Sequence, residues 1–218
     1  MKIMNKEHSK LISEMLSAYG ITSEPSASEN MSAGEMVQAL LLKVNRDGIP
    51  QLIKYLANSD FYTAPASTRF HGNYEGGLAE HSVNVCAILR NLNITHNLGL
   101  SDETIILTSL MHDLCKVNFY KKGTRNVKDE RGNWYAKEIW EVDDKMPLGH
   151  GEKSVYILQS FVKLSREEVF LIRWHMGPFA CATGDQYGFN NAVDYQKSIA
   201  LMYTADFLAS SLYEAKID

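Results

Sequence analysis

The chain has 218 residues, of which 45% are hydrophobic and 22% are charged. This composition is typical of a globular domain and argues against a fibrous or largely disordered chain. Lys and Arg total 22 and Asp and Glu total 26, so the formal net charge is −4. Because binders of long duplex nucleic acid usually carry a strong basic excess, we expect no such partner.

The sequence contains no apolar run that would cross a bilayer, so we expect no membrane partner. Met1 to Lys10 are polar and lack the apolar stretch of a secretory signal. The three cysteines, Cys86, Cys115 and Cys181, are odd in number and show no CxxC spacing. This pattern predicts neither a disulfide framework nor a cysteine-based zinc site, and it favours a reducing cytoplasm.

Apolar residues recur at helical spacing along most of the chain. Ser101, followed by two acidic residues, is a typical N-cap, and Ser165 with Glu168 forms a capping-box pattern. The expected helices span about 11–16, 36–44, 52–56, 77–92, 101–112, 151–163, 165–175 and 192–213. We expect the Gly- and aromatic-rich stretch 177–191 to be a loop that gates a site.

One internal stretch, residues 117–149, departs from the helical pattern. It is rich in aromatic residues and contains a turn signal at Arg131-Gly132-Asn133. We interpret it as an inserted β-hairpin. The predicted fold is therefore mainly α, a helical bundle with one hairpin between its helices.

Histidines and aspartates lie at or near the ends of several expected helices. His112 and Asp113 are adjacent at the end of an apolar helix, and Asp206 stands within an apolar helical run. A lone histidine at a helix end is usually a cap or a surface group, and we interpret His8 and His96 as surface residues. A carboxylate buried among apolar side chains needs a partner or a metal ion. Imidazole and carboxylate ligands together suit divalent transition metals.

Several short motifs resemble those of the HD-domain superfamily of metal-dependent phosphohydrolases. They are the run Phe70–His81 with its Gly-Gly-Leu sequence, Leu110–Lys116, Gly149–Gly151, Trp174–Gly177 and Ala205–Ala209. The run before His81 is most similar to the branch that contains bacterial 3′-5′ exoribonucleases. The resemblance predicts an HD domain over residues 70–218, with residues 1–69 as a helical extension packed on it.

The resemblance implies a helical bundle around one or two divalent ions, namely Mn, Fe, Co, Ni or Zn, with Mg as a further candidate. The residues at the family's ligand positions are His81, His112, Asp113, His150, His175 and Asp206. Asp113 would bridge to a second ion completed by His150 and His175, and a metal-activated hydroxide would be the nucleophile. Cys115 stands where the family often has glycine, which puts a tight backbone approach at that turn in doubt.

Asp113 and Lys116 are the expected catalytic residues. Lys116 follows the His112-Asp113 pair by three residues, where its cation would stabilise charge on a phosphate, although a solvated lysine is the alternative. A basic, aromatic hairpin would grip phosphate and base, although a solvated hairpin fits equally. The expected substrate-binding residues are Lys116, Lys121, Lys122, Arg125, Tyr74 and Gln186.

These observations favour a cytoplasmic metal-dependent phosphohydrolase of the EC 3.1 class. Its substrate would be a nucleotide or short oligonucleotide, cleaved as a phosphomonoester or a phosphodiester. Two alternatives remain open, an HD-type di-iron oxygenase and a non-catalytic nucleotide-binding regulatory module. The amino-terminal helices are typical of packing or dimerisation elements, so a homodimer is compatible with the sequence.

Overall fold

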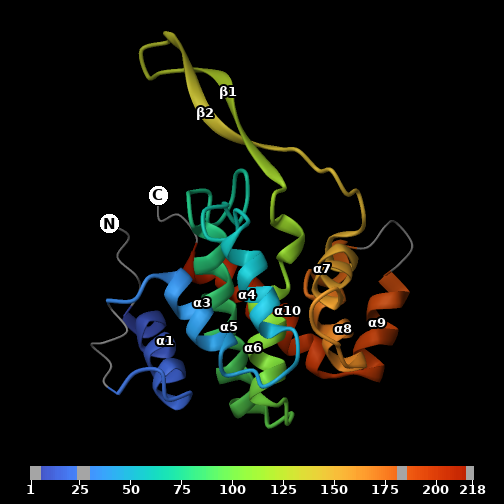
Figure 1. Cartoon of the computed structure of the whole chain (residues 1–218). Helices are drawn as coiled ribbons and strands as arrows, with labels where there is room; N and C mark the ends of the chain where they lie inside the picture. The colour runs from blue at the N-terminus through green and yellow to red at the C-terminus, as the bar shows by residue number, and fades with distance from the viewer. Residues whose placement is uncertain (1–5, 24–29, 181–185, 215–218) are drawn as a thin grey trace.

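The computed structural model describes residues 6–23, 30–180 and 186–214 of the chain (Figure 1). It is mainly helical with a small two-stranded antiparallel sheet, which confirms the predicted fold class. The elements are α1 (Lys6–Ala18), α3 (Ala33–Leu41), α4 (Ile49–Ala57), α5 (Gly77–His96), α6 (Asp102–Met111), a 3₁₀ turn (Leu114–Lys116), β1 (Tyr120–Lys128), β2 (Trp134–Val142), α7 (His150–Gln159), α8 (Arg166–Trp174), a 3₁₀ turn (Gly177–Ala180), α9 (Gln186–Tyr195), α10 (Ser198–Leu208) and a π-helical turn (Ala209–Tyr213). Among the described helices, none is long and apolar enough to span a membrane.

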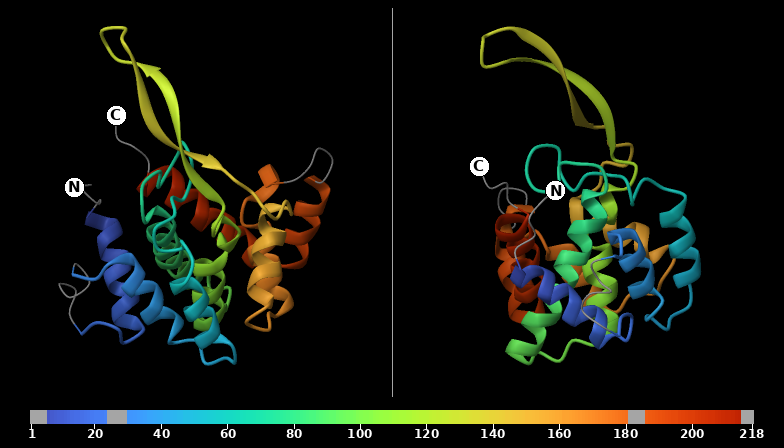
Figure 2. Two further views of the ribbon diagram at one scale, coloured as in Figure 1. Left: turned by 45° about the horizontal axis from the view of Figure 1, so that its top comes forward. Right: turned by 90° about the vertical axis from the view of Figure 1, so that its left-hand side faces the viewer.

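The helix α5 lies at the centre of the molecule, with helices from both ends of the chain around it (Figure 2). It contacts α1, α3, α6 and α10, so nearly all of its residues from Gly77 to Leu89 are buried. The helix α6 is buried in the same way from Thr104 to Met111. Both helices are therefore largely surrounded by protein, and α5 buries the polar residues His81, Ser82 and Asn84.

The amino-terminal helices share a hydrophobic core with the rest of the chain. Leu16 of α1 and Leu40 of α3 belong to the same cluster of buried side chains as Leu89 of α5 and Met202 of α10. Burial of apolar surface contributes roughly 25 cal/mol per Å² to stability, so these contacts hold α1 and α3 firmly against α5.

Two predicted helix starts are confirmed by their hydrogen bonds. The hydroxyl of Ser101 accepts from the N–H of Thr104 at 3.1 Å, and the hydroxyl of Ser165 accepts from the N–H of Glu168 at 3.2 Å. The carboxylate of Glu168 accepts in return from the N–H of Ser165 at 2.8 Å. These caps set the starts of α6 and α8, whose opposite ends carry His112 and His175.

The predicted hairpin is confirmed. Its strands pair in register from Tyr120↔Val142 to Lys128↔Trp134. In the turn, the carboxylate of Asp129 accepts hydrogen bonds from the N–H groups of Arg131 and Asn133. The hairpin extends away from the helices, joined to them through the 3₁₀ turn after α6 and the segment before α7 (Figures 1 and 2).

The prediction of a single helix over residues 192–213 is wrong. The helix α9 ends at Tyr195 and α10 begins at Ser198. Between them, the amide of Gln196 donates to the carboxylate of Glu167 and, at 2.7 Å, to the hydroxyl of Ser198. Because these contacts tie the chain to α8, they interrupt a run that the apolar spacing alone would continue.

The predicted loop over 177–191 is also wrong in its second half, because α9 begins at Gln186. Phe189 of α9 packs between Trp174 and Tyr203, with ring centroids 5.9 and 6.1 Å away. These long-range aromatic contacts stabilise a helix in a stretch whose glycines and aromatic residues indicated a loop. Residues 181–185, which include Cys181, lie outside the described residues.

Candidate metal centre

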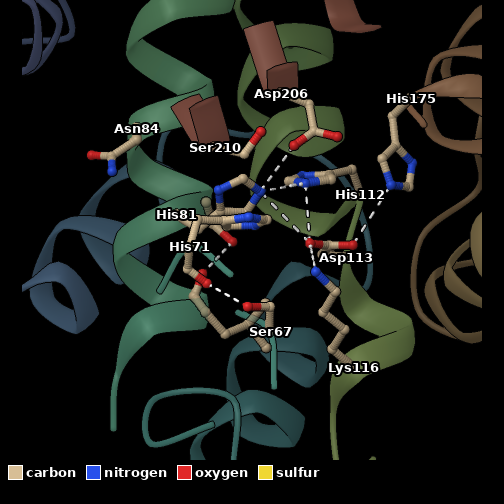
Figure 3. Close-up of polar contacts among 12 residues, drawn as sticks. Ser67, His71, His81, Asn84, His112, Asp113, Lys116, His175, Asp206 and Ser210 are labelled. Atoms are coloured by element: carbon tan, nitrogen blue, oxygen red, sulfur yellow. Dashed lines mark hydrogen bonds and ion pairs between the residues drawn. The ribbon is translucent and has the colours of Figure 1, made fainter. Parts of the chain in front are cut away.

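The structure brings together six side chains that are widely separated in the sequence. They come from α5, the end of α6, the start of α7, the end of α8, and α10: His81, His112, Asp113, His150, His175 and Asp206. Figure 3 shows all of these except His150 facing a common centre. His81, His112 and His175 are fully buried, whereas the side chain of His150 is 31% exposed, the most exposed of the six.

A glycine allows two of the contributing helices to come close. A Cβ atom on Gly151, at the start of α7, would lie 2.4 Å from the carbonyl oxygen of Arg173 in α8. Only glycine permits this approach. The rings of the neighbouring residues His150 and His175 are consequently 5.1 Å apart between centroids.

One group of ligand atoms surrounds Nε2 of His81. This atom lies 3.2 Å from Nε2 of His112 and 3.2 Å from Oδ1 of Asp206. Oδ2 of Asp113 is 3.7 Å from the same nitrogen and 3.4 Å from Nε2 of His112. Two imidazoles and two carboxylates therefore converge on a small volume.

A second group faces the other oxygen of Asp113. Oδ1 of this carboxylate lies 2.7 Å from Nε2 of His150 and 3.6 Å from Nε2 of His175. Nε2 of His175 is buried and has no hydrogen-bond partner among the described residues. An unsatisfied buried nitrogen is costly in free energy, so its position is explained best by a ligand that it binds.

Backbone carbonyls determine the tautomers of two of these histidines. Nδ1 of His112 lies 2.7 Å from the carbonyl oxygen of Ser109, and Nδ1 of His175 lies 2.6 Å from that of Ile172. Because a carbonyl only accepts, both Nδ1 atoms carry a hydrogen, which leaves Nε2 as the atom of each ring that can bind a metal ion. Hydrogen bonds of this kind orient histidine ligands in metal sites.

The donor set fits a divalent metal ion. Lone pairs of neutral imidazoles that face one another and face carboxylate oxygens repel, unless a proton or a cation lies between them. Burial alone would lower the pKa of His81, but the carboxylates of Glu214 and Asp206 raise it to about 10. Imidazole nitrogen and carboxylate oxygen together are ligands for Mn, Fe, Co, Ni or Zn.

Lys116 lies beside the centre in the 3₁₀ turn after α6. Its Nζ donates to Oδ2 of Asp113 at 2.6 Å, and the residue is buried. Burial opposes its charge, but the Asp113 carboxylate raises the pKa of Lys116 above its ordinary value. Lys116 is therefore a buried cation, and the alternative of a solvated lysine is wrong.

The other expected substrate residues lie in β1, in the loop before α5 and at the start of α9. Lys122 and Arg125 line a groove of about 1010 Å³ between the hairpin and the loop before α5, whereas Lys121 lies 3.9 Å from Asp143. Tyr74 is half-buried, and burial together with the neighbouring Glu80 raises its pKa. Gln186 is the first residue of α9, and its side chain lies outside the described part of the structure.

Three residues near the centre were not predicted from the sequence. Glu214 accepts a hydrogen bond from Nδ1 of His81 at 3.1 Å. The side chain of Asn84 donates to Glu214, and its oxygen lies 2.7 Å from Nε2 of His8 in α1. His8 is buried, so its interpretation as a surface residue is wrong, whereas the prediction for the exposed His96 is confirmed. No local sequence pattern indicates Glu214, because its partners are distant in the chain.

The fold and the site define a helical protein with a buried histidine–aspartate centre that could hold a metal ion. The family model of the HD domain matches residues 78–200, more than half of the chain, so the chain belongs to the HD domain family. Proteins of this family are generally metal-dependent hydrolases and bind divalent metals. Neither curated proteins nor solved structures gave a match to the chain.

Proposed function

We propose that this protein is a metal-dependent phosphohydrolase that cleaves a phosphoester bond in a nucleotide or short oligonucleotide. The observation that carries the proposal is that the two carboxylate oxygens of Asp113 face different histidines. Oδ2 faces His81 and His112. Oδ1 faces His150 and His175. His81, His112, Asp113 and Asp206 would hold one ion. His150 and His175 would hold a second ion, with Asp113 as the shared ligand.

A divalent cation bound at this centre supplies Lewis acidity and lowers the pKa of a coordinated water. The protein itself supplies a further cation, Lys116, next to Asp113. An ammonium group has three N–H donors, so Lys116 can contact Asp113 and a phosphoryl oxygen together. Such a contact stabilises the negative charge that develops when a phosphoester is cleaved, which favours phosphate chemistry at this site.

The groove beside the hairpin supports a substrate larger than phosphate. Its wall from the loop before α5 includes Arg69 and Asn73, and this loop also carries His71, whose ring lies 4.9 Å from that of His81. On the hairpin side, Lys122 lies over the ring of Trp140, with Nζ 5.3 Å from the centroid. Cations and aromatic faces along one groove suit the phosphates and bases of a short single strand.

The finer assignment within the family rests on the sequence. The Gly-Gly-Leu run before His81 supports a relationship to the branch with bacterial 3′-5′ exoribonucleases. The cysteine pattern supports a cytoplasmic location. We propose manganese as the first metal to test, and a homodimer as the oligomeric state to test.

The experiment is hydrolysis by purified, metal-stripped protein reloaded with Mn²⁺, Co²⁺, Ni²⁺, Mg²⁺ or Zn²⁺. The substrates are bis(p-nitrophenyl) phosphate, p-nitrophenyl phosphate, a panel of nucleotides and a short fluorescent oligonucleotide. We expect metal-dependent release of product that is lost in His112→Ala and Asp113→Asn. The matched control is Asp194→Asn, because Asp194 is an exposed carboxylate in α9.

Other outcomes would contradict the proposal. Oxygen consumption by the iron-loaded protein without release of phosphate would support the di-iron oxygenase. Tight nucleotide binding without turnover under every metal would support the regulatory module. Equal hydrolysis by the wild type and by Asp113→Asn would show that the activity arises elsewhere.

A further inference from the structure

A row of buried polar side chains lies behind His81, on the side away from the metal centre. Nδ1 of His81 lies 3.1 Å from both carboxylate oxygens of Glu214. Nδ2 of Asn84 donates to Oε1 of Glu214 at 2.7 Å, and Oδ1 of Asn84 lies 2.7 Å from Nε2 of His8. All four side chains are buried, so water does not replace these contacts.

Each hydrogen bond in this row has one possible direction. An ionised carboxylate only accepts, so the hydrogen lies on Nδ1 of His81 and the NH₂ group of Asn84 faces Glu214. The carbonyl oxygen of Asn84 therefore faces His8, which donates from Nε2. With its hydrogen on Nδ1, His81 can offer the lone pair of Nε2 to a metal ion bound on the side of His112 and Asp206.

The row connects the centre to both ends of the described chain. His8 belongs to α1, and its ring stacks on that of Tyr213 at 4.4 Å between centroids. Glu214 follows the π-helical turn that continues α10. Both residues lie outside residues 78–200, the part of the chain that the HD family model matches.

We propose that Glu214 is a positioning residue for His81, held in place by Asn84 and His8, so that segments flanking the matched domain complete the metal centre. The proposal rests on the proposed function only in requiring that the centre binds a metal ion. A carboxylate behind a histidine ligand fixes the tautomer and the ring orientation, and it makes the imidazole a stronger donor. Loss of such a partner typically weakens metal binding by about 10- to 100-fold.

The test is metal titration of the full-length protein with Co²⁺ alone, followed by the visible spectrum of the bound ion and by competition with a chelator. The variants are Glu214→Ala, which removes the acceptor, and Glu214→Gln, which keeps an acceptor oxygen without the charge. We expect affinity to fall by about 10- to 100-fold in Glu214→Ala, with an altered Co²⁺ spectrum. Glu214→Gln should lie between Glu214→Ala and the wild type.

The matched control is Glu168→Gln, because Glu168 is also a buried glutamate but pairs with Arg46 away from the centre. It should bind Co²⁺ as the wild type does. His8→Phe keeps an aromatic ring against Tyr213 while removing the donor to Asn84. We expect its affinity to fall less than that of Glu214→Ala, since His8 acts on His81 through two intermediate residues.

Wild-type affinity and spectrum in both Glu214 variants would overturn the proposal while leaving the proposed function intact. A wild-type protein that binds no Co²⁺ would overturn both. If Glu214→Ala does not fold, the comparison of Glu214→Gln with Glu168→Gln decides the question. Equal Co²⁺ affinities in these two variants would then overturn the proposal.

Discussion

The ammonium of Lys116 lies 2.6 Å from Oδ2 of Asp113, inside the protein, while Oδ1 of the same carboxylate lies 2.7 Å from Nε2 of His150. One carboxylate thus contacts the ammonium of Lys116 and faces histidines on both sides. Burial opposes its ionisation, but Lys116 and His112 hold the pKa of Asp113 well below its ordinary value. This contact links the proposed metal ligands to the base of the hairpin.

Lys116→Met should lower kcat by about 100- to 1000-fold, the usual effect of removing one group that stabilises charge in a transition state. Metal affinity should be retained or increased, because a cation next to a proposed ligand is lost. Steady-state hydrolysis of bis(p-nitrophenyl) phosphate and a Mn²⁺ titration measure the two effects. A variant with unchanged kcat would show that Lys116 serves only the local structure.

Metal stoichiometry should separate the two groups of histidines. His175→Ala should lower the bound metal by about one ion per chain, because His175 is a proposed ligand of the second ion through its contact with Oδ1 of Asp113, although it also lies near His112 and Asp206. Asp113→Ala should lower it further, since both groups share this carboxylate. Elemental analysis after gel filtration measures the ratio. Identical stoichiometry in His175→Ala and the wild type would indicate a single ion bound by the His81 group.

Gly151→Ala should destabilise the protein by about 1–3 kcal/mol, because the new methyl group would lie 2.4 Å from a backbone carbonyl of α8. It should also weaken metal binding, since α7 and α8 must separate and move His150 from His175. Urea unfolding and Co²⁺ titration measure both effects. Gly149→Ala is the control, because its methyl group would meet only the flexible end of Glu152. Equal stability of the two variants would contradict the role given to Gly151.

The ion pair between Arg46 and Glu168 should make the free energy of unfolding depend on pH in the acid range. Burial alone would raise the pKa of Glu168, but the hydrogen bonds from Arg46 and from the N–H of Ser165 lower it below 4.5. A carboxyl group with a lower pKa in the folded state stabilises the protein above the unfolded pKa. That contribution is lost as the pH falls from about 4.5 through the folded pKa.

Arg46→Ala should therefore cost about 3 kcal/mol at pH 7, near the lower end for a broken buried pair, because Arg46 is 24% exposed. The difference from the wild type should shrink below pH 4.5. Urea unfolding at several pH values tests this. If the wild type and Arg46→Ala differed in stability by the same amount at pH 7 and below pH 4.5, the ion pair would not be the source of the pH dependence.

The hairpin groove should add affinity for a short single strand. The double variant Lys122→Ala/Arg125→Ala should bind a fluorescent oligonucleotide more weakly. The magnitude of the slope of the logarithm of the binding constant against the logarithm of the salt concentration should fall by about 1.4, as expected for two lost phosphate contacts. Fluorescence anisotropy over a salt series measures this. Lys54→Ala, an exposed lysine of α4, is the control. An unchanged slope in the double variant would place the strand elsewhere.

Local chemistry made several features predictable from the sequence. The caps at Ser101 and Ser165 join residues three positions apart, and the hairpin turn is closed by contacts within 129–133. The resemblance of the His112-Asp113 motif to the HD family led to the six candidate ligands. These signals are readable because each depends on neighbours along the chain or on a family motif.

The tertiary structure alone decided how the centre is completed. His8 is buried because α1 packs across α5, which brings it to a residue 76 positions away, and Glu214 reaches His81 across 133 positions. The break at Gln196 likewise depends on Glu167 in another helix. The sequence by itself determined the fold class, the helix caps, the hairpin and the candidate ligands. Packing determined which oxygen of Asp113 faces which histidine, and which buried groups stand behind His81, because such contacts exist only once distant helices share one core.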